Sequence, residues 1–446
     1  MTLLDILPSL RHATRPRLDP AVWPHTTHVD EGGAISVGGV ALTDIADHYG
    51  TPCYVLDEED FHHRIRSIRR ALGRTEMIYA GKALLTAGIA RWLAADGVGV
   101  DVCSPGELAA ALAGGVDPAR IVLHGNAKSH EDLQGAVNAG VGRIVLDSPL
   151  EITYLAGLAR RPQQVLIRVT PEIDIDGHPA LTTGIADAKF GLTADDGQLA
   201  EAVERVVAEP RLNLVGLHCH LGSQITDAAV YGQAVHRMVE AMADIRRHHG
   251  VILPELNLGG GFGVPYVAGD AELDLTLLAS TIEDALDDAC ATHRFPRPRV
   301  VVEPGRAISA RAGVTLYRVA AVKARPEGRT FVAVDGGMSD NPRVALYGAR
   351  YSVALANRHP SGPTARFTVA GRHCEAGDVI ARDVELPADI HAGDLVAVAC
   401  TGAYHHSMAS TYNMVGRPPL IAVRDGRLHT LVRRETTADL LARDRG

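Results

Sequence analysis

Short apolar runs alternate with longer amphipathic segments between about residues 75 and 310. The runs are rich in β-branched residues and end in polar or glycine-rich clusters, while intervening segments such as 106–115 and 132–140 carry apolar residues at helical spacing. The eight runs are residues 77–82, 98–104, 120–126, 143–148, 165–171, 214–220, 255–261 and 300–305. Eight strand–helix units in one block predict a (β/α)8 barrel, with a doubly wound open sheet as the alternative.

The pattern changes after residue 311, where apolar and polar residues alternate and turn residues are frequent. Alternation without helical periodicity predicts a β domain, either a β-sandwich or a small β-barrel. Residues 33–50 are expected to contribute a strand to that domain before a helix leads into the barrel. The predicted organisation, in the α/β class, is an N-terminal segment 1–45, a barrel 46–311 and a C-terminal β domain 312–446.

Charge and composition narrow the class of protein. The formal net charge of -9 is spread along the chain without a run of one sign, which argues against a nucleic-acid partner. No apolar run reaches 18 residues, and residues 1–16 lack the basic lead and cleavage site of a signal peptide, so no membrane association is expected. The six cysteines include no CxxC pair, which favours a reducing cytoplasm over a disulfide framework or structural zinc site.

The chemistry of a (β/α)8 barrel lies on the loops after the carboxyl ends of its strands. The polar residues at those positions are Lys82, Asp101, His124, Asp147, Arg168, His220, Gly259 and Glu303. Lys82 is the first candidate among them, because desolvation in a pocket turns a lysine amine into a nucleophile suited to imine chemistry. Taken alone, Lys82 is better explained as a solvated residue at a helix N-terminus.

A glycine cluster follows the seventh predicted strand, with Gly259, Gly260, Gly261 and Gly263 in the segment LNLGGGFG. Without side chains, these residues let backbone N–H groups approach a phosphate closely. The cluster matches neither a Walker A loop nor the dinucleotide fingerprint, and a tight turn is the simpler alternative.

Two histidines, His218 and His220, lie on one face of the sixth predicted strand. They could bind a metal, but no third and fourth ligand stands near them in the sequence, so no metal is expected. An imidazole stacked on a flat ring suits His220, and Ser223 could add a hydroxyl to a phosphate.

A carboxylate, Glu303, and a cation, Arg306, follow the last predicted strand. A carboxylate there can pair with a protonated pyridine nitrogen and keep the ring an electron sink. In the C-terminal domain the Cys374 thiol could donate a proton, although a lone cysteine is more often simply buried. One lysine, one phosphate cradle, one stacking ring and one carboxylate together meet the needs of pyridoxal phosphate.

Eight motifs occur in the order found in the bacterial diaminopimelate decarboxylases: YAGKA, HGN-K, GLHCHLGSQI, LNLGGGFG, EPGR, VDGGMSDNPR, CE-GD and TGAY. On these motifs the chain resembles that family of the alanine-racemase-like group IV decarboxylases, from about residue 38 to 423. The resemblance implies a barrel that binds pyridoxal 5′-phosphate, a C-terminal β domain, and a homodimer with active sites at the subunit interface. It also implies conversion of meso-2,6-diaminopimelate to L-lysine and CO2.

The resemblance further implies roles for individual residues. Lys82 would hold the cofactor as a Schiff base, His220 would stack on its ring, and Glu303 would bind its pyridine nitrogen. Cys374, from the partner subunit, would reprotonate Cα. The residues implied around the phosphate are Ser223, Gly259, Gly260, Gly261 and Tyr404. The residues implied to contact the distal end of the substrate are Arg306, Arg343, Tyr347, Glu375 and Tyr404. Asp101 and Arg168 match further positions of the cofactor pocket.

The chain departs from the family at four places: Pro105 in Ser104–Glu107, where the family has small-Gly-Gly-Glu, Ala127 in HGNAKS, Ala376 in CEAGD, and His405–His406 after Tyr404. These departures leave the cofactor chemistry intact but bear on substrate choice. The alternative is a paralogous decarboxylase that acts on ornithine, arginine or a secondary-metabolism substrate. A racemase and a non-catalytic carrier of the cofactor fit less well, because Cys374 and Arg343 suit decarboxylation of a substrate with a distal carboxylate. Whether residues 180–195 form an ordered lid is left open.

Overall fold

The computed structural model describes residues 18–173, 189–193, 197–326, 328–361 and 363–446. Residues 1–16, from which no signal peptide is expected, and residues 180–188 and 194–195 of the lid segment lie outside the described residues. The chain divides into two compact units. The barrel unit comprises Arg64–Val264 and Ala271–Ala307, and the β unit comprises Met1–His63, Pro265–Asp270 and Ile308–Gly446.

Eight parallel strands close the barrel unit into a barrel, in the order β10-β11-β12-β5-β6-β7-β8-β9. They are β5 (Glu76–Ala80), β6 (Gly99–Val102), β7 (Ile121–Leu123), β8 (Arg143–Leu146), β9 (Gln163–Arg168), β10 (Leu212–His218), β11 (Glu255–Asn257) and β12 (Arg299–Val302). Each coincides with one of the eight predicted runs to within a few residues, so the predicted (β/α)8 barrel is confirmed and the open sheet is excluded.

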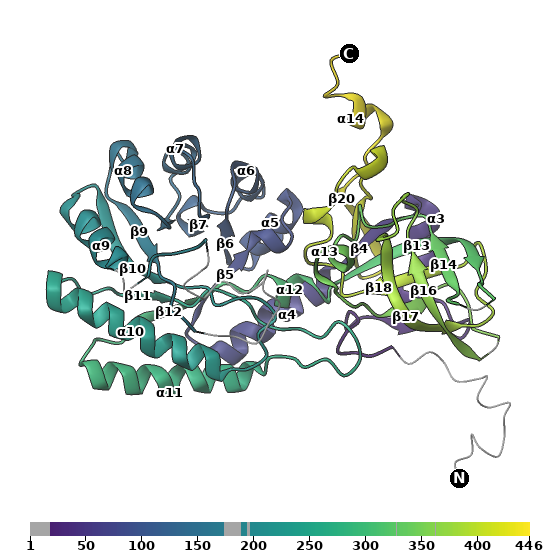
Figure 1. The fold of residues 1–446 in the computed structure, drawn as a ribbon, viewed down its shortest axis with the longest axis horizontal. Helices are drawn as coiled ribbons and strands as arrows, with labels where there is room; N and C mark the ends of the chain where they lie inside the picture. Colours follow the sequence, from purple (N-terminus) through teal and green to yellow (C-terminus); the bar gives the residue numbers. More distant parts are fainter. Residues whose placement is uncertain (1–17, 174–188, 194–196, 327, 362) are drawn as a thin grey trace, which may run out of the picture. The chain divides into compact units, whose positions relative to one another are not determined.

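Helices surround these strands (Figure 1). They are α5 (Ala87–Ala95), α6 (Pro105–Ala113), α7 (His130–Ala139), α8 (Pro149–Leu158), α9 (Gln198–Ala208), α10 (Ala229–His249), α11 (Leu275–His293) and the short α12 (Arg306–Ser309). Helix α7 shows how the sequence sets their ends: Ser129 and Asp132 form a capping box, and Gly140 ends the helix in the left-handed conformation. Among the described helices, none combines the length and the apolar character needed to cross a membrane.

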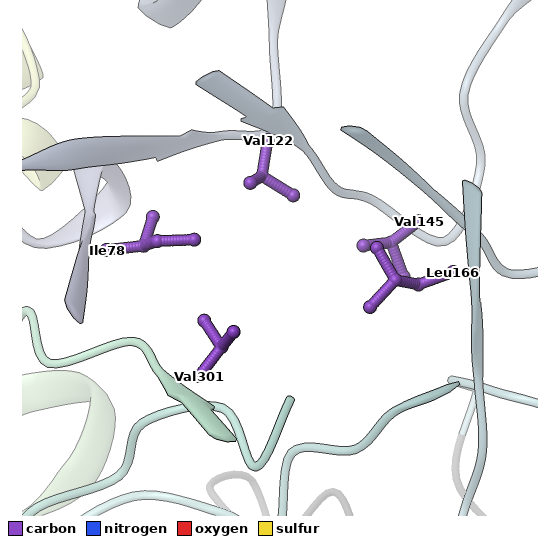
Figure 2. Close-up of a cluster of buried hydrophobic side chains, with 5 residues drawn as sticks. All are labelled: Ile78, Val122, Val145, Leu166 and Val301. Carbon is purple, nitrogen blue, oxygen red and sulfur yellow. The ribbon is translucent and has the colours of Figure 1, made fainter. Parts of the chain in front are cut away.

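The middle of the barrel is filled by five buried aliphatic side chains, which point toward one another in Figure 2: Ile78, Val122, Val145, Leu166 and Val301. Side chains two positions apart in a strand share a face. The residues two positions further along therefore face the interior at the carboxyl end of the barrel: Ala80, His124, Asp147, Arg168 and Glu303. An apolar layer thus forms the floor beneath a polar one.

Two arginines and two glutamates form a cluster of ion pairs at the opposite end of the barrel. Arg143 is buried and reaches two glutamates, with Nη1 2.7 Å from Glu255 Oε1 and Nη2 2.5 Å from Glu76 Oε1. Arg299 Nη2 lies 2.6 Å from Glu255 Oε2. All four residues are the first of their strands, so the cluster ties β5, β8, β11 and β12 together.

Removing Arg143 is expected to destabilise the barrel unit. Among the described residues, the substitution Arg143→Ala leaves the buried Glu255 with only the exposed Arg299 as an ionic partner, which should cost about 3 kcal/mol, at the low end for a broken buried pair. Urea unfolding measures this as a lower midpoint. The control is Arg297→Ala, which removes an exposed pair with Glu283 and Asp287 and should cost less than about 1 kcal/mol. Equal shifts in the two variants would contradict the assignment.

The β unit is built on one large sheet with the strand path β17-β16-β14-β13-β4-β19-β20, to which β18 and β15 are added. Its strands are β4 (Cys53–Asp57), β13 (Gly313–Lys323), β14 (Phe331–Val334), β15 (Val353–Leu355), β16 (Thr364–Ala370), β17 (Val379–Pro387), β18 (Leu395–Ala399), β19 (Leu420–Arg424) and β20 (Arg427–Val432). The predicted β domain is thereby confirmed.

The N-terminal part of the chain also contributes to the β unit. Strand β4 pairs antiparallel with β13 and parallel with β19, so it lies inside the large sheet. The stretch 33–50, which the sequence pattern assigns to this sheet, instead forms β2 (Ile35–Val37), β3 (Val40–Ala41) and α3 (Leu42–Tyr49). Strands β2 and β3 belong to a separate three-stranded sheet with β1 (His28–Val29). An N-terminal strand does join the large sheet of the β unit, as predicted, but this strand is β4, which begins after residue 50.

Candidate active site

A cavity of about 350 Å³ opens at the carboxyl ends of the barrel strands. Its lining includes six of the residues predicted to share one mouth: Lys82, Asp101, His124, Arg168, His220 and Glu303. Asp147 lies next to this group, with Oδ2 3.8 Å from Arg168 Nη1. The structure therefore brings together, from separate strands, residues that the sequence could only place at strand ends.

Two lysines line the cavity, and their surroundings differ. Lys82 lies in a 3-10 turn, Gly81–Ala83, directly after β5 and is exposed. Lys128 is buried, and its Nζ donates to Gly125 O and Val145 O, both at 2.7 Å, and pairs with Glu151 Oε2 at 2.8 Å. Burial lowers the pKa of Lys128, which by itself would favour it as a nucleophile. Its three contacts nevertheless use all the hydrogens of an ammonium group, which leaves Lys82 as the candidate.

Glu303 is held at the centre of the cavity floor by three side chains. Asn257 Nδ2 donates to Oε1 at 2.7 Å, His124 Nε2 lies 3.0 Å from the same oxygen, and His218 Nε2 lies 3.2 Å from Oε2. The rings of His124 and His218 meet edge to face, with centroids 4.5 Å apart. Both oxygens of this carboxylate are therefore fixed in position.

The charges in this group follow from burial and proximity. Burial lowers the pKa of His218 to about 4, so this ring is neutral at pH 7. Burial also opposes a charge on His124, but Asp101 and Glu303 outweigh it and raise the pKa of His124. For Glu303, burial acts to raise the pKa, yet His124 and His218 hold it well below its ordinary value. Glu303 is thus a buried carboxylate whose histidine neighbours favour its ionised form.

Asp101 completes the polar layer. Its Oδ1 lies 3.7 Å from His124 Nε2, and this buried atom has no hydrogen-bond partner among the described residues. Burial raises the pKa of Asp101 to about 7. The Asp101 carboxyl therefore has one oxygen without a hydrogen-bond partner, which is typical of a ligand site.

His220 is set against the glycine cluster. Burial, with Lys82 and Arg168 nearby, lowers the pKa of His220 well below its ordinary value, so the ring is neutral. Its Nδ1 accepts the backbone N–H of Gly260 at 3.2 Å, which fixes the ring orientation.

The glycine cluster forms a turn that tolerates no side chain. A Cβ on Gly260 would lie 2.2 Å from Glu303 O, and one on Gly261 would lie 2.4 Å from Gly222 O. Gly259 and Gly261 also have φ of +67° and +98°, which favour glycine. Glycine is therefore required here for close packing of the backbone, and the role of this turn in phosphate binding stays a prediction.

Arg306 and Ser223 meet beside this turn in the barrel unit, where Arg306 Nη2 donates to Ser223 Oγ at 2.8 Å. Arg306 therefore contacts Ser223, which the family resemblance implies to bind the phosphate. The role of Arg306 at the distal end of the substrate stays a prediction.

Arg168 is held by residues on both sides. Its guanidinium carbon lies 4.4 Å from the centre of the Phe190 ring, a cation–π contact. The residue after Phe190, Gly191, donates its N–H to Asp147 Oδ1 at 3.0 Å. Leu192 donates to Arg168 O at 2.8 Å, and Thr170 Oγ1 donates to Phe190 O at 2.7 Å. Residues 190–192 are thus bound to the end of β9, and Phe190 forms part of the cavity wall.

The β unit holds a second group of predicted residues. Arg343 begins the short helix α13 (Arg343–Tyr347) and is buried. Its Nη1 donates to Tyr266 Oη at 2.8 Å, and its guanidinium carbon lies 5.4, 5.7 and 5.6 Å from the ring centres of Tyr266, Tyr347 and Tyr404. The structure thus brings Arg343, Tyr347 and Tyr404 together and adds Tyr266, which the sequence interpretation did not include.

Cys374 and Glu375 lie on an exposed turn between β16 and β17. Tyr412 Oη donates to Glu375 Oε2 at 2.8 Å. Cys374 is a free thiol, like the other five cysteines. Ala376, where the family has serine, is exposed on the same turn.

Two of the other departures, Pro105 and His405, are accommodated locally. Ser104 caps α6 by accepting the N–H of Glu107 at 3.2 Å, Pro105 takes the first helical position, and Glu107 Oε2 accepts the N–H of Cys103 at 2.7 Å. His405 is buried with its ring centre 5.1 Å from that of Tyr351, so it packs inside the β unit. Neither departure disturbs a predicted cofactor residue.

The ligand atoms of His124, His218 and Glu303 lie within 4.8 Å of one another, which is compatible with a metal ion. Their direct contacts with Glu303 explain this cluster without an ion. The pair suggested by the sequence, His218 and His220, does not form such a cluster within the described residues. The absence of a metal stays a prediction.

Pyridoxal phosphate fits the residues of the cavity. A lysine, a neutral imidazole and a carboxylate kept ionised line the cavity, and these are groups that this cofactor requires. The unsatisfied Asp101 Oδ1 adds a polar atom for the bound molecule to meet.

Comparison with known proteins agrees with this site. Residues 58–310 match the family described as pyridoxal-dependent decarboxylase, pyridoxal binding domain. Diaminopimelate decarboxylase of Actinosynnema pretiosum subsp. auranticum is 53% identical over 444 residues, covering 100% of both chains. The enzyme of that name from Mycobacterium tuberculosis (strain ATCC 25618 / H37Rv) is 44% identical, covering 95% of this chain and 98% of the other.

The crystal structure of diaminopimelate decarboxylase from M. jannaschii in co-complex with L-lysine has a TM-score of 0.88 and 31% identity, covering 94% of this chain and 98% of that one. The fold and site therefore define a pyridoxal-dependent decarboxylase, whose cofactor is pyridoxal 5′-phosphate. Within that class, the chain belongs to the diaminopimelate decarboxylase family.

Several residues of the site were missed as functional by sequence reasoning. Asn257 could have been found, because strand alternation places it inside the barrel two positions after Glu255. Phe190 and Tyr266 could not, since each follows a strand end through a loop whose path the sequence pattern does not give.

Proposed function

We propose that this chain decarboxylates meso-2,6-diaminopimelate to L-lysine and CO2, the last step of lysine biosynthesis. The observation that carries this substrate choice is the buried Arg343 among three tyrosines. A guanidinium in a partly desolvated aromatic setting recognises a carboxylate strongly and directionally. Diaminopimelate has a carboxylate at its distal end, whereas ornithine and arginine have none.

The barrel residues would prepare the reacting end of the substrate. When bound, pyridoxal phosphate accepts the electron pair released on decarboxylation. Lys82 would hold the cofactor and later release the product, and His220 would cover one face of its ring. Glu303, kept ionised by His124 and His218, would hold a proton on the pyridine nitrogen. Ser223 and the glycine turn would bind the phosphate.

The residues of the β unit would supply the proton for Cα and bind the distal end of the substrate. The Cα–carboxylate bond breaks, CO2 leaves, and a proton from Cys374 Sγ takes its place on Cα. Arg343, with Tyr347, Tyr404 and Glu375, would hold the distal amino-acid end and so decide which carboxylate is lost.

We also propose a homodimer in which each Cys374 serves the partner's cofactor. The exposed turn that carries Cys374 and Glu375, together with the exposed side chains of Leu346, Tyr412 and Met414 on the same unit, supports an interface there. Mixing equal amounts of Lys82→Ala subunits and Cys374→Ala subunits, which keep only a small residual activity, should restore about one quarter of the activity, since half of randomly formed dimers are mixed and each has one intact site. No recovery after verified subunit exchange would contradict shared sites.

The six free cysteines support a reducing, cytoplasmic location for this enzyme.

The function is tested by the selectivity of the purified protein with pyridoxal phosphate. We expect measurable kcat/KM with meso-diaminopimelate and none with L-ornithine, L-arginine or L-lysine. Arg343→Gln should lower kcat/KM for diaminopimelate by about 10²-fold, because a charge-assisted carboxylate contact is lost. Preference for ornithine or arginine would instead support the paralogous decarboxylase.

A further inference from the structure

The residue before the proposed acid, His373, is tied to two separate segments of the β unit. It is buried, although Cys374 and Glu375 beside it are exposed. Its Nε2 lies 2.8 Å from Ser339 Oγ, and its Nδ1 lies 2.9 Å from Asn413 Oδ1. An amide oxygen only accepts, so Nδ1 carries the proton in this arrangement. Both ring nitrogens are therefore committed, and the ring cannot rotate without losing a hydrogen bond.

The partners of His373 are themselves fixed. Ser339 Oγ lies 3.3 Å from Asp340 Oδ1, and Asp340 Oδ2 accepts from Tyr317 Oη at 2.5 Å, deep in the unit. Asn413 has φ of +52°, a left-handed conformation that asparagine tolerates better than most residues. The network thus runs from the buried core of the β unit to the exposed turn.

The backbone of the turn is anchored by a second residue, Asp378. Its Oδ2 accepts the N–H of His373 at 2.7 Å, and its Oδ1 accepts the N–H of Met338 at 2.6 Å. A Cβ on Gly371 would lie 2.2 Å from this carboxylate, so Asp378 fits closely in its place. Asp378 fixes where the turn begins, and the His373 side chain fixes its direction.

We propose that His373 is a positioning residue for Cys374, which holds the thiol where proton transfer to Cα requires it. This inference rests on the proposed role of Cys374 as the acid. A loss of orientation of about 1 Å typically costs about 10²-fold in rate, so a rigid anchor directly before the thiol has a large effect on kcat and little on cofactor binding. The Tyr412 hydrogen bond to Glu375 holds the other side of the turn.

The test is a double-mutant cycle on the full-length holoenzyme. His373→Phe, which keeps a ring but no hydrogen bond, should lower kcat about 10- to 100-fold and leave the visible absorption of bound pyridoxal phosphate unchanged. In a Cys374→Ala background, the same substitution should cause no further loss, since His373 acts through the thiol. His373→Gln, which can still reach Ser339, should recover part of the loss. His429→Ala, an exposed histidine of the same unit, is the matched control and should equal the wild type.

The possible outcomes separate the two hypotheses. An unchanged kcat in His373→Phe overturns the inference, as does an equal loss in both backgrounds, which would mean that His373 acts independently of Cys374. Full activity of Cys374→Ala alone overturns the proposed acid and this inference with it. If His373→Phe does not fold, Ser339→Ala, which removes one hydroxyl, decides by the same cycle with a smaller loss.

Discussion

The variant Lys82→Ala is expected to lose at least about 10⁴-fold in kcat, because both the covalent hold on the cofactor and an amine for proton transfer are removed. The cavity walls should survive, since Lys82 lies exposed in a short turn and adds little to the packing. Steady-state decarboxylation with saturating pyridoxal phosphate measures the loss, and circular dichroism checks that the variant remains folded.

The alternative to Lys82 is Lys128, which lines the same cavity. Burial lowers the pKa of Lys128, but its Nζ is committed to Gly125 O, Val145 O and Glu151. Borohydride reduction of the wild-type holoenzyme followed by peptide mass analysis shows which lysine carries the cofactor. We expect the label on Lys82 alone. A label on Lys128, or a Lys82→Ala variant within about tenfold of wild type, would refute the assignment.

The second large effect is expected for Glu303→Gln, which should lower kcat by about 10²- to 10³-fold, the usual cost of removing a preorganised electrostatic partner. An amide cannot hold a proton on the pyridine nitrogen, and it leaves His124 without its carboxylate partner at 3.0 Å. Lys82 and the glycine turn are unchanged, so the variant should still bind the cofactor. The measurement is kcat normalised to the bound cofactor, determined by absorbance.

The control for this variant is Glu201→Gln, an exposed carboxylate on α9 that should leave kcat unchanged. If Glu303→Gln has normal kcat once its cofactor content is restored, Glu303 serves cofactor binding alone, and the electronic role is wrong. A role in cofactor binding alone would give weak cofactor binding with a normal rate per bound cofactor. The electronic role predicts normal cofactor binding with a lowered rate per bound cofactor.

The sequence was sufficient to predict the barrel, because short apolar runs recur eight times between longer segments with helical periodicity. The cavity followed from one further rule, that residues at the carboxyl ends of barrel strands share one mouth. Lys82, Asp101, His124, Arg168, His220 and Glu303 do line one cavity. What the pattern could not give was how these side chains contact one another.

The contacts around Glu303 illustrate this limit. Asn257 lies 46 residues from Glu303 in the chain, and His218 lies 85 residues away, so their hydrogen bonds depend on strand register and barrel stagger. The same holds for Tyr266 beside Arg343, 77 residues apart. Strand alternation shows that Asn257 faces inward, but only the closed barrel shows which side chain it meets.

The prediction places the N-terminal strand of the large sheet within residues 33–50, whereas that strand is β4 at Cys53–Asp57. Residues 35–41 alternate as a strand does, and they do form β2 and β3. Strand β4, CYVLD, is buried along its whole length as several barrel strands are, but it lies before the repeated strand–helix block by which those strands were identified. A sequence pattern therefore identifies the small separate sheet more easily than the central strand of the large one.

The central claim is that this enzyme forms L-lysine from meso-diaminopimelate. The most direct measurement is product analysis after incubation of the purified holoenzyme with meso-diaminopimelate, following released CO2 and resolving the enantiomers of lysine. The account predicts one CO2 for each L-lysine, no D-lysine, and neither product with Lys82→Ala. A protein that binds pyridoxal phosphate through Lys82 but releases no CO2 from diaminopimelate would contradict the claim. It would point to the Ala376 turn as the site of altered substrate choice.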